Sequence, residues 1–207
     1  MQKNWCWILS DLSMSNRKVG LFFGSFNPIH IGHLIIANYM ANYTDLDEVW
    51  FVVSPQNPFK EKKSLGNEYD RLEMVNLAIE GAENLRASDI EFGLPQPSYT
   101  IDTLTHLTEK YPNKDFMLIM GEDNLQGLRK WKNADIILRD YKIIVYPRPG
   151  YDAGELREHR SVIMTDTPLM ELSSTFLRNS IKGRKSVKFY TPDAVIDFID
   201  KKGLYSN

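Results

Sequence analysis

Apolar residues fall into two repeating patterns along the chain, short unbroken runs and longer segments with helical spacing. The runs stop at glycine, proline or serine, as buried strands usually do. Strands are predicted over residues 19–23, 49–53, 115–120 and 142–146, and weaker ones over 87–92 and 161–164. Helices are predicted over residues 31–43, 69–79, 102–111, 136–139, 173–182 and 192–201. Ser173 and the Thr191-Pro192 pair suit the starts of the last two helices.

This alternation of strands and helices predicts a single α/β domain, doubly wound and Rossmann-like, with a mostly parallel central sheet flanked by helices. The domain is expected over residues 17–207. Residues 1–16 show no period and are expected to form a disordered tail, with Met14 as a candidate true start. In a sheet of this kind, ligands bind at the carboxyl ends of the strands, near the point where the strand order reverses.

Composition and charge narrow the class of protein. The chain has 25 basic and 27 acidic residues and a net charge of −2, which argues against a general nucleic-acid binder because such proteins carry a basic excess. No membrane segment is expected, because the uncharged stretch between Lys18 and Asp45 is broken by Asn, His, Gly and Pro. The single cysteine, Cys6, has no internal partner, so we expect a reducing compartment and a cytoplasmic protein.

The strongest chemical signal is the segment 24–33, GSFNPIHIGH, which lies between a predicted strand and a predicted helix. Backbone amides at such a helix start attract phosphate. His30 and His33 are three residues apart, so both imidazoles can face one side of a helical turn. Taken alone, such a pair is more often structural, or half of a metal site. The segment is neither a P-loop nor a G-x-G-x-x-G dinucleotide fingerprint.

Four segments together resemble one enzyme family. Residues 24–33 are similar to the G-x-F-x-P-x-H-x-G-H signature of the nucleotidyltransferase superfamily, and residues 172–178, LSSTFLR, to its second signature. Residues 97–104, PSYTIDTL, and 121–131, GEDNLQGLRKW, resemble the substrate segments of bacterial nicotinate-nucleotide adenylyltransferases. The C-terminal segment 191–205 is also similar to that family. The resemblance covers residues 18–205 and implies transfer of an adenylyl group from ATP to nicotinate mononucleotide.

The resemblance also implies which residues handle ATP. The expected ATP contacts are Gly24, Ser25, Phe26, His30, His33, Gly121, Asp123, Ser174, Thr175 and Arg178. The residues expected to take part in catalysis are His30, His33, Lys60 and Arg178. Mg²⁺ is expected to arrive with ATP rather than in a protein metal site, and no tightly bound organic cofactor is expected.

Nicotinate mononucleotide is the implied acceptor. Its expected contacts are Asn27, Tyr99, Thr100, Trp131, Lys132 and Arg148. Trp131 suits stacking on the pyridine ring, and the backbone N–H groups near Thr100 and Lys132 suit its carboxylate. Arg148 is expected to add positive charge. Asn27 stands where the family often has Asp, so a contact there would be a neutral hydrogen bond.

Two alternatives stay open at this point. One keeps the fold and changes the acceptor, for example to nicotinamide mononucleotide or pantetheine phosphate, with adenylyl or cytidylyl transfer. The other is a nucleotide-binding module without turnover. No nucleic-acid or membrane partner is expected, and the oligomeric state is left open.

Overall fold

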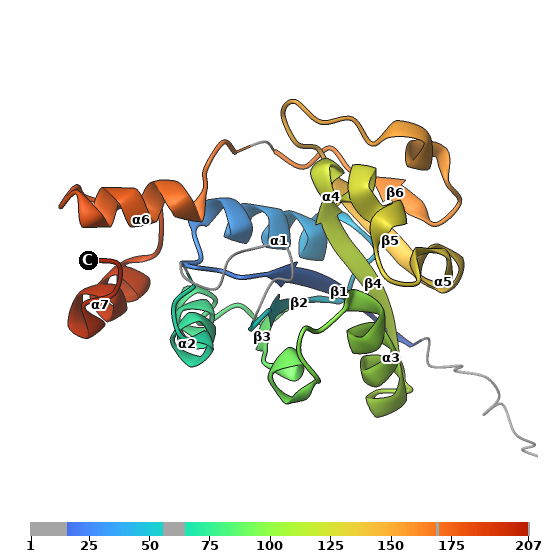
Figure 1. Cartoon of the computed structure of the whole chain (residues 1–207), viewed down its shortest axis with the longest axis horizontal. Helices are drawn as coiled ribbons and strands as arrows, with labels where there is room; N and C mark the ends of the chain where they lie inside the picture. The colour runs from blue at the N-terminus through green and yellow to red at the C-terminus, as the bar shows by residue number, and fades with distance from the viewer. Residues whose placement is uncertain (1–15, 56–64, 169, 207) are drawn as a thin grey trace, which may run out of the picture.

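A six-stranded parallel sheet forms the centre of the computed structural model, which describes residues 16–55, 65–168 and 170–206 (Figure 1). The strands are β1 (Arg17–Gly24), β2 (Glu48–Val53), β3 (Leu85–Ser88), β4 (Lys114–Gly121), β5 (Lys142–Tyr146) and β6 (Val162–Met164). Their order in the sheet is β3-β2-β1-β4-β5-β6, and every neighbouring pair is parallel. The prediction of a doubly wound α/β domain is confirmed.

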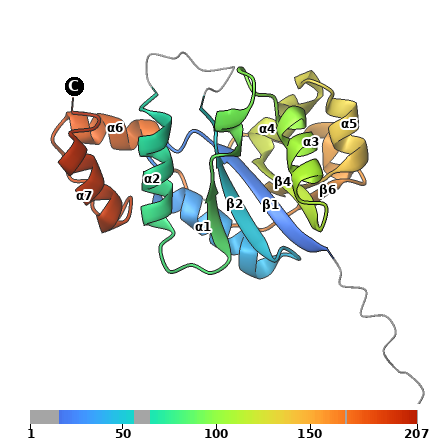
Figure 2. The same cartoon turned by 90° about the horizontal axis from the view of Figure 1, so that it is seen from below.

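Helices cover both faces of the sheet. They are α1 (Ile31–Tyr43), α2 (Glu68–Ala78), α3 (Thr100–Lys110), α4 (Glu122–Gly127), α5 (Ala134–Asp140), α6 (Ser174–Lys182) and α7 (Asp193–Lys202). Short 3-10 turns are η2 (Ile90–Gly93), η3 (Leu128–Lys130) and η4 (Gly154–Glu158). Figure 2 shows α2 and α7 side by side at one end, with α3, α4 and α5 at the other.

The core is divided into two clusters because successive strand residues point to opposite faces. In β1, Val19 and Leu21 pack with Leu104 of α3 and Ile137 of α5. Phe22 packs on the other face, in a cluster that takes its helical residues from α1, α2 and α7. These clusters hold the two layers of helices against the sheet, and the apolar runs in the sequence correspond to strands buried on both sides.

The order of the strands reverses around β1, which lies between β2 and β4. In an open parallel sheet, the chain leaves on opposite faces at this point and a crevice forms at the carboxyl ends of the strands. The segment 24–33 follows β1 directly, so it lies at this crevice.

The strand predicted over residues 87–92 is found instead over Leu85–Ser88. Only residues 85–88 pair with β2, and the chain then turns into the 3-10 segment η2. The turn buries Glu91, which is 3% exposed and accepts a hydrogen bond from Thr103 Oγ1 at 2.8 Å. The tertiary contact with α3 therefore ends the strand earlier than the apolar pattern predicts.

Two other expectations concern segments that lie wholly or partly outside the described residues. Residues 1–15 lie outside the described residues, as does most of the loop predicted over 56–67. The loop ends at Asn67, whose side chain accepts a hydrogen bond from the Tyr69 N–H and caps α2. Among the helices that the structure describes, none is long and apolar enough to cross a membrane.

Candidate active site

The loop after β1 is shaped by a folded-back phenylalanine. Phe26 has a φ of 43°, which is rare for a side chain larger than glycine, and its ring is 1% exposed. A Cβ on Gly24 would lie 2.7 Å from Phe26 Cζ, so glycine is required for this ring position. The Phe26 ring also packs edge-on against His33, with centroids 5.1 Å apart. The loop is thus fixed by its own side chains.

The two histidines of this loop form a stacked pair. Their ring centroids are 3.6 Å apart with an angle of 20° between the planes. The His30 N–H donates to His33 Nδ1 at 3.3 Å. Because Nδ1 accepts this bond, neutral His33 carries its hydrogen on Nε2. His33 is thereby prepared to donate a hydrogen bond from Nε2.

His30 is held neutral. It is 4% exposed, and burial lowers its pKa to about 4, with a smaller lowering from the positive charge of Arg148. Its Nδ1 is buried and has no hydrogen-bond partner among the described residues. A buried imidazole nitrogen without a partner is costly, and a bound ligand atom would relieve that cost.

We expect His30 to make the stability of the protein depend on pH. The unfolded chain takes up a proton near pH 6.5 while the folded chain does not until about pH 4, so acid favours unfolding. The free energy of unfolding should fall by about 2 kcal/mol between pH 7 and pH 5 on this account. Urea unfolding of the wild type and His30→Gln at both pH values measures it.

The matched control is His106→Gln, which changes a half-buried histidine on α3. It should keep the wild-type pH dependence, whereas His30→Gln should lose most of it. The same slope in all three proteins would show that His30 is not held neutral.

Side chains from the C-terminal quarter of the chain donate hydrogen bonds to backbone carbonyl groups of the loop after β1. Arg178 Nη1 donates to Asn27 O at 2.8 Å, Ser174 Oγ to Pro28 O at 2.9 Å, and Thr191 Oγ1 to Ile29 O at 2.9 Å. The Ile31 N–H donates in turn to Tyr190 O at 2.8 Å. Four hydrogen bonds therefore join residues 27–31 to the C-terminal part of the chain, two of them to the second signature and two to residues 190–191. The Thr191 hydroxyl therefore bonds to the loop and does not cap α7, whose N-cap residue is Pro192.

A large cavity of about 1140 Å³ opens over this junction. Its polar lining combines the residues His30, His33, Asp123, Arg148, Ser174, Thr175 and Arg178. The N-terminus of α6 is at this cavity and is capped by Ser173, whose Oγ accepts from the Phe176 N–H at 3.2 Å. The cavity therefore offers imidazole, guanidinium, hydroxyl and helix N-terminal amide groups, a set that suits the phosphates of a nucleotide.

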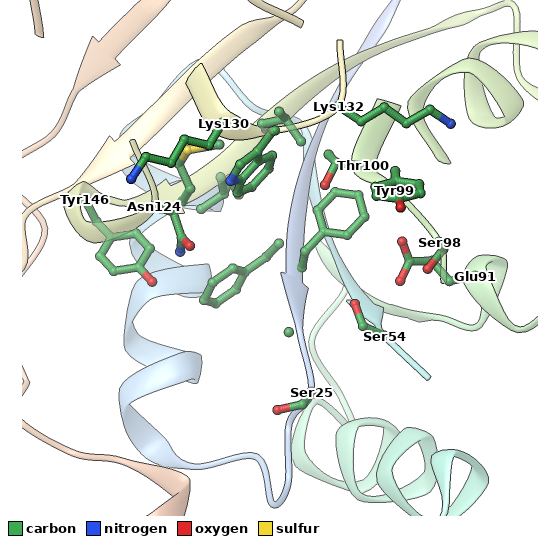
Figure 3. Close-up of a pocket in the computed structure, with 17 residues that line it drawn as sticks. Ser25, Ser54, Glu91, Ser98, Tyr99, Thr100, Asn124, Lys130, Lys132 and Tyr146 are labelled. Atoms are coloured by element: carbon green, nitrogen blue, oxygen red, sulfur yellow. The ribbon is translucent and has the colours of Figure 1, made fainter. Parts of the chain in front are cut away.

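A smaller cavity of about 240 Å³ lies beside it, with five aromatic rings of Phe, Tyr and Trp among its lining residues (Figure 3). Glu91, Ser98, Tyr99 and Thr100 lie along one side in Figure 3, and Lys130, Asn124 and Tyr146 along the other. Trp131 and Phe23 also line it. This combination of flat apolar rings and a few polar groups suits a planar heterocycle.

The two cavities meet at the carboxyl end of β1. They have in common the lining residues Phe22, Phe23, Gly24, Ser25, Asn124 and Tyr146. Two ligands bound one in each cavity would therefore approach each other over the strand end and the following loop.

Comparison with known proteins assigns the chain to a family. Residues 21–180 match the cytidylyltransferase-like family. A probable nicotinate-nucleotide adenylyltransferase of Cytophaga hutchinsonii is 55% identical over 190 residues, which cover 92% of this chain and 99% of that protein. Another, from Bacillus licheniformis, is 36% identical over 189 residues, 91% of this chain and 98% of that protein. The chain belongs to the nicotinate-nucleotide adenylyltransferase family.

Solved structures agree on the fold. The nicotinic acid mononucleotide adenylyltransferase of Plasmodium falciparum, complexed with NaAD, matches with a TM-score of 0.77 at 20% identity, over 91% of this chain and 97% of that one. A putative nicotinate-nucleotide adenylyltransferase from Vibrio parahaemolyticus matches with a TM-score of 0.69 at 22% identity, over 92% and 96%. These likenesses concern the fold, and the relatives and family model above confirm the family assignment made from the sequence motifs.

The structure gathers most of the residues expected to bind ATP in this nicotinate-nucleotide adenylyltransferase family member. All of them line the large cavity except Gly121. A Cβ on Gly121 would lie 2.5 Å from Asp123 Oδ1, so this glycine makes room for the carboxylate. Lys60 lies outside the described residues.

The residues expected to bind the mononucleotide are divided between the two cavities. Tyr99, Thr100, Trp131 and Lys132 line the small cavity, and Lys132 Nζ is paired with Asp102 at 2.9 Å. Asn27 and Arg148 instead line the large cavity. Arg148 Nη1 lies 3.6 Å from Asp123 Oδ2 there.

Sequence reasoning missed a buried arginine. Arg71, on α2, is fully buried, and its guanidinium donates to four carbonyl oxygens. The acceptors are Ser25 O at 2.6 Å, Ser54 O at 2.8 Å, Gly66 O at 3.0 Å and Pro55 O at 3.2 Å. A signal existed, because Arg71 lies three and four residues before Met74 and Val75, on the apolar face of its helix.

Glu91 and Tyr146 were also missed. Burial raises the pKa of Glu91, which lines the small cavity, although the hydroxyl of Thr103 donates to it and opposes the rise. Burial likewise raises the pKa of Tyr146, at the junction of the two cavities. Neither position carries a sequence signal, since each lies in or next to an apolar run that reads as an ordinary strand.

Proposed function

We propose that this chain transfers the adenylyl group of ATP to nicotinate mononucleotide, which gives nicotinate adenine dinucleotide and pyrophosphate in the biosynthesis of NAD. The observation that carries the proposal is the junction of a phosphate-suited cavity and an aromatic cavity at the end of β1. The phosphate of the mononucleotide would meet the α-phosphate of ATP at this junction.

The reaction needs no general base. The phosphate of nicotinate mononucleotide is ionised at pH 7, and its oxygen attacks the α-phosphorus of ATP while the bond to the pyrophosphate oxygen breaks. The electron pair of that bond leaves with pyrophosphate. Catalysis then depends on holding the two phosphates in line and on stabilising the charge that develops.

His33 is proposed to make the contact closest to the reacting phosphate. Its Nδ1 accepts from the His30 N–H, which places the hydrogen of neutral His33 on Nε2. His30 is proposed to bind a phosphate oxygen, which would give its buried Nδ1 a partner. A hydrogen bond that strengthens as negative charge builds up lowers the barrier more than it tightens substrate binding.

The remaining ATP contacts are proposed around the same cavity. Arg178 and Lys60 are proposed to bind the β- and γ-phosphates, together with the N-terminus of α6 at Ser174 and Thr175. Ser174 Oγ already donates to Pro28 O, so its backbone N–H is the better candidate donor. The carboxylate of Asp123 is proposed to accept hydrogen bonds from the ribose, and Mg²⁺ is proposed to arrive bound to the ATP phosphates.

In the small cavity, Trp131 is proposed to stack on the pyridine ring beside Tyr99. The backbone N–H groups near Thr100 and Lys132 are proposed to bind its carboxylate. The ammonium group of Lys132 is held by Asp102, which agrees with a backbone role for that residue. Arg148 is proposed to bind the phosphate of the mononucleotide, since it lies in the large cavity beside Asp123.

The acid form of the mononucleotide should be preferred to the amide. A carboxylate entering the pocket loses water and needs donors in return, and charge-assisted hydrogen bonds are worth about 1.5–3 kcal/mol each. A tenfold preference requires only about 1.4 kcal/mol. We expect kcat/KM with nicotinate mononucleotide to exceed that with nicotinamide mononucleotide at least tenfold, measured by release of pyrophosphate.

Trp131→Ala should raise KM for both mononucleotides, because stacking does not depend on the ring substituent. Tyr43→Ala, which removes a 72% exposed ring on α1, is the control and should leave both values unchanged. Equal kcat/KM for acid and amide in the wild type would refute the selectivity while leaving adenylyl transfer in place.

The experiment that tests the function itself is an incubation with Mg²⁺, ATP and nicotinate mononucleotide, followed by detection of both products. Replacing ATP with CTP, or the acceptor with pantetheine phosphate, should give little product. We also propose that the enzyme works in the cytoplasm, in line with its single cysteine.

A further inference from the structure

The C-terminal residues of the chain return to the active-site loop. After α7, Gly203 adopts a φ of 63° and the Leu204 N–H donates to Ile199 O at 3.0 Å. Tyr205 then adopts a φ of 62°. This left-handed conformation is unfavourable for a residue with a side chain. Strain of this kind persists only where the surrounding contacts hold it, and it often occurs near functional sites.

The strained backbone directs the Tyr205 hydroxyl to the loop after β1. Its OH donates to Asn27 Oδ1 at 2.7 Å, across 178 positions of sequence. Asn27 is 2% exposed. Burial raises the pKa of Tyr205 above its ordinary value, so the hydroxyl keeps its proton and stays a donor. The amide oxygen of Asn27 is therefore a fixed acceptor for the end of the chain.

Gly66 packs tightly against the same oxygen. Its N–H donates to Asn27 Oδ1 at 3.3 Å. A Cβ at this position would lie 3.1 Å from Asn27 Oδ1 and 3.6 Å from the Tyr205 hydroxyl oxygen. The contact between Asn27 and Tyr205 is thus enclosed, and a methyl group added at Gly66 would press on it.

Asn27 connects this contact to the large cavity. Its backbone oxygen accepts from Arg178 Nη1 at 2.8 Å, and Arg178 Nη2 donates to Thr175 Oγ1 at 3.1 Å. Both residues line the large cavity. The Tyr205 hydroxyl is therefore one residue away from the guanidinium proposed to bind the β- and γ-phosphates.

Helix α7, which precedes Tyr205, is itself fixed. Lys202 Nζ pairs with Asp70 on α2 at 3.2 Å, and Val195 and Ile199 are buried in the same apolar cluster as residues of α2. Asp70 precedes Arg71, whose guanidinium donates to Ser25 O on the other side of Asn27. The end of the chain is thus part of one rigid connection between α2, α7 and the loop.

We propose that Tyr205 is a positioning residue for adenylyl transfer, which through Asn27 fixes the loop and orients Arg178 toward the triphosphate. This inference rests on the proposed function. On this proposal Asn27 links Tyr205 to Arg178 through hydrogen bonds. The sequence had instead suggested a direct contact between Asn27 and the mononucleotide.

Tyr205→Phe removes only the hydroxyl and tests the proposal. We expect kcat for release of pyrophosphate from ATP and nicotinate mononucleotide to fall about five- to tenfold, while KM for the mononucleotide changes less than twofold. One misplaced group in the site is enough for such a loss. Tyr43→Phe, at a 72% exposed position, should keep the wild-type kcat.

A double-mutant cycle with Asn27→Ala separates positioning from general destabilisation. If Tyr205 acts through Asn27, Tyr205→Phe should have no further effect on kcat once Asn27 is alanine. Multiplying losses in the double variant would overturn the proposal. A wild-type kcat in Tyr205→Phe would also overturn it, whereas inactivity of the wild type with this substrate pair would overturn the proposed function instead.

Gly66→Ala keeps the test valid if Tyr205→Phe folds poorly. It leaves the hydroxyl in place and crowds the acceptor, and the position does not have a left-handed φ that would forbid alanine. We expect a fall in kcat similar to that of Tyr205→Phe, at a melting temperature close to that of the wild type. An unchanged kcat in Gly66→Ala would contradict the proposal.

Discussion

His33→Ala is expected to lower kcat by about 10²–10³-fold, the loss typical when one donor to a developing negative charge is removed. His33 Nδ1 is fixed by the His30 N–H, and the ring packs edge-on against Phe22 and Phe26. Its Nε2–H is therefore positioned before substrate arrives. KM for ATP should change less than threefold, because ground-state binding also draws on Arg178 and the N-terminus of α6.

Steady-state kinetics with ATP and nicotinate mononucleotide measure both values. His33→Gln keeps an N–H donor on a more flexible side chain and should recover part of the loss, and His106→Ala is the control for a histidine outside both cavities. A loss that appears in KM with kcat unchanged would show that His33 binds ATP without acting on the transition state.

Arg71→Met should be the most destabilising single change outside the apolar core, with a loss of about 3 kcal/mol or more in the free energy of unfolding. It leaves four carbonyl oxygens without their donor, and buried unsatisfied groups cost about 1–3 kcal/mol each, offset in part because a buried cation is removed. These acceptors belong to the ends of β1 and β2 and to the residues on both sides of 56–64. Activity should fall with stability.

Urea unfolding measures the first effect. Arg71→Lys keeps the charge but not the fork of donors, so it should recover only part of the stability. Arg160→Met, at an exposed position, is the control and should change stability by less than about 0.5 kcal/mol. A stability close to that of the wild type in Arg71→Met would mean that the carbonyl groups find other partners.

The architecture could be predicted from the sequence because parallel strands that are buried on both faces appear as unbroken apolar runs. The runs at 19–23, 49–53, 115–120 and 142–146 all form central or near-central strands. The edge of the sheet was harder to predict. The strand at 85–88 ends early because Glu91 turns inward to Thr103, a contact that no local pattern encodes. The short helix α4 also carries no periodic signal, since it spans only 122–127.

The candidate site could be located from the sequence where a motif has its own chemistry. The stacked histidines and Arg178 are recognisable from GSFNPIHIGH and LSSTFLR, and the structure brings them to one cavity. The sequence does not show what each side chain faces. The Asn27 side chain accepts a hydrogen bond from the Tyr205 hydroxyl, and Ser174 Oγ donates to Pro28 O. Arg148 lies beside Asp123 in the large cavity. Each of these depends on contacts between segments more than 20 residues apart.

Transfer of radioactive phosphorus tests the central claim most directly. The protein is incubated with nicotinate mononucleotide and ATP labelled at either the α- or the γ-phosphate, and the products are separated. We predict that label from the α-position appears in nicotinate adenine dinucleotide, that label from the γ-position appears in pyrophosphate, and that His33→Ala slows both together. Label from the γ-position in the mononucleotide product, or no transfer from the α-position, would contradict the account.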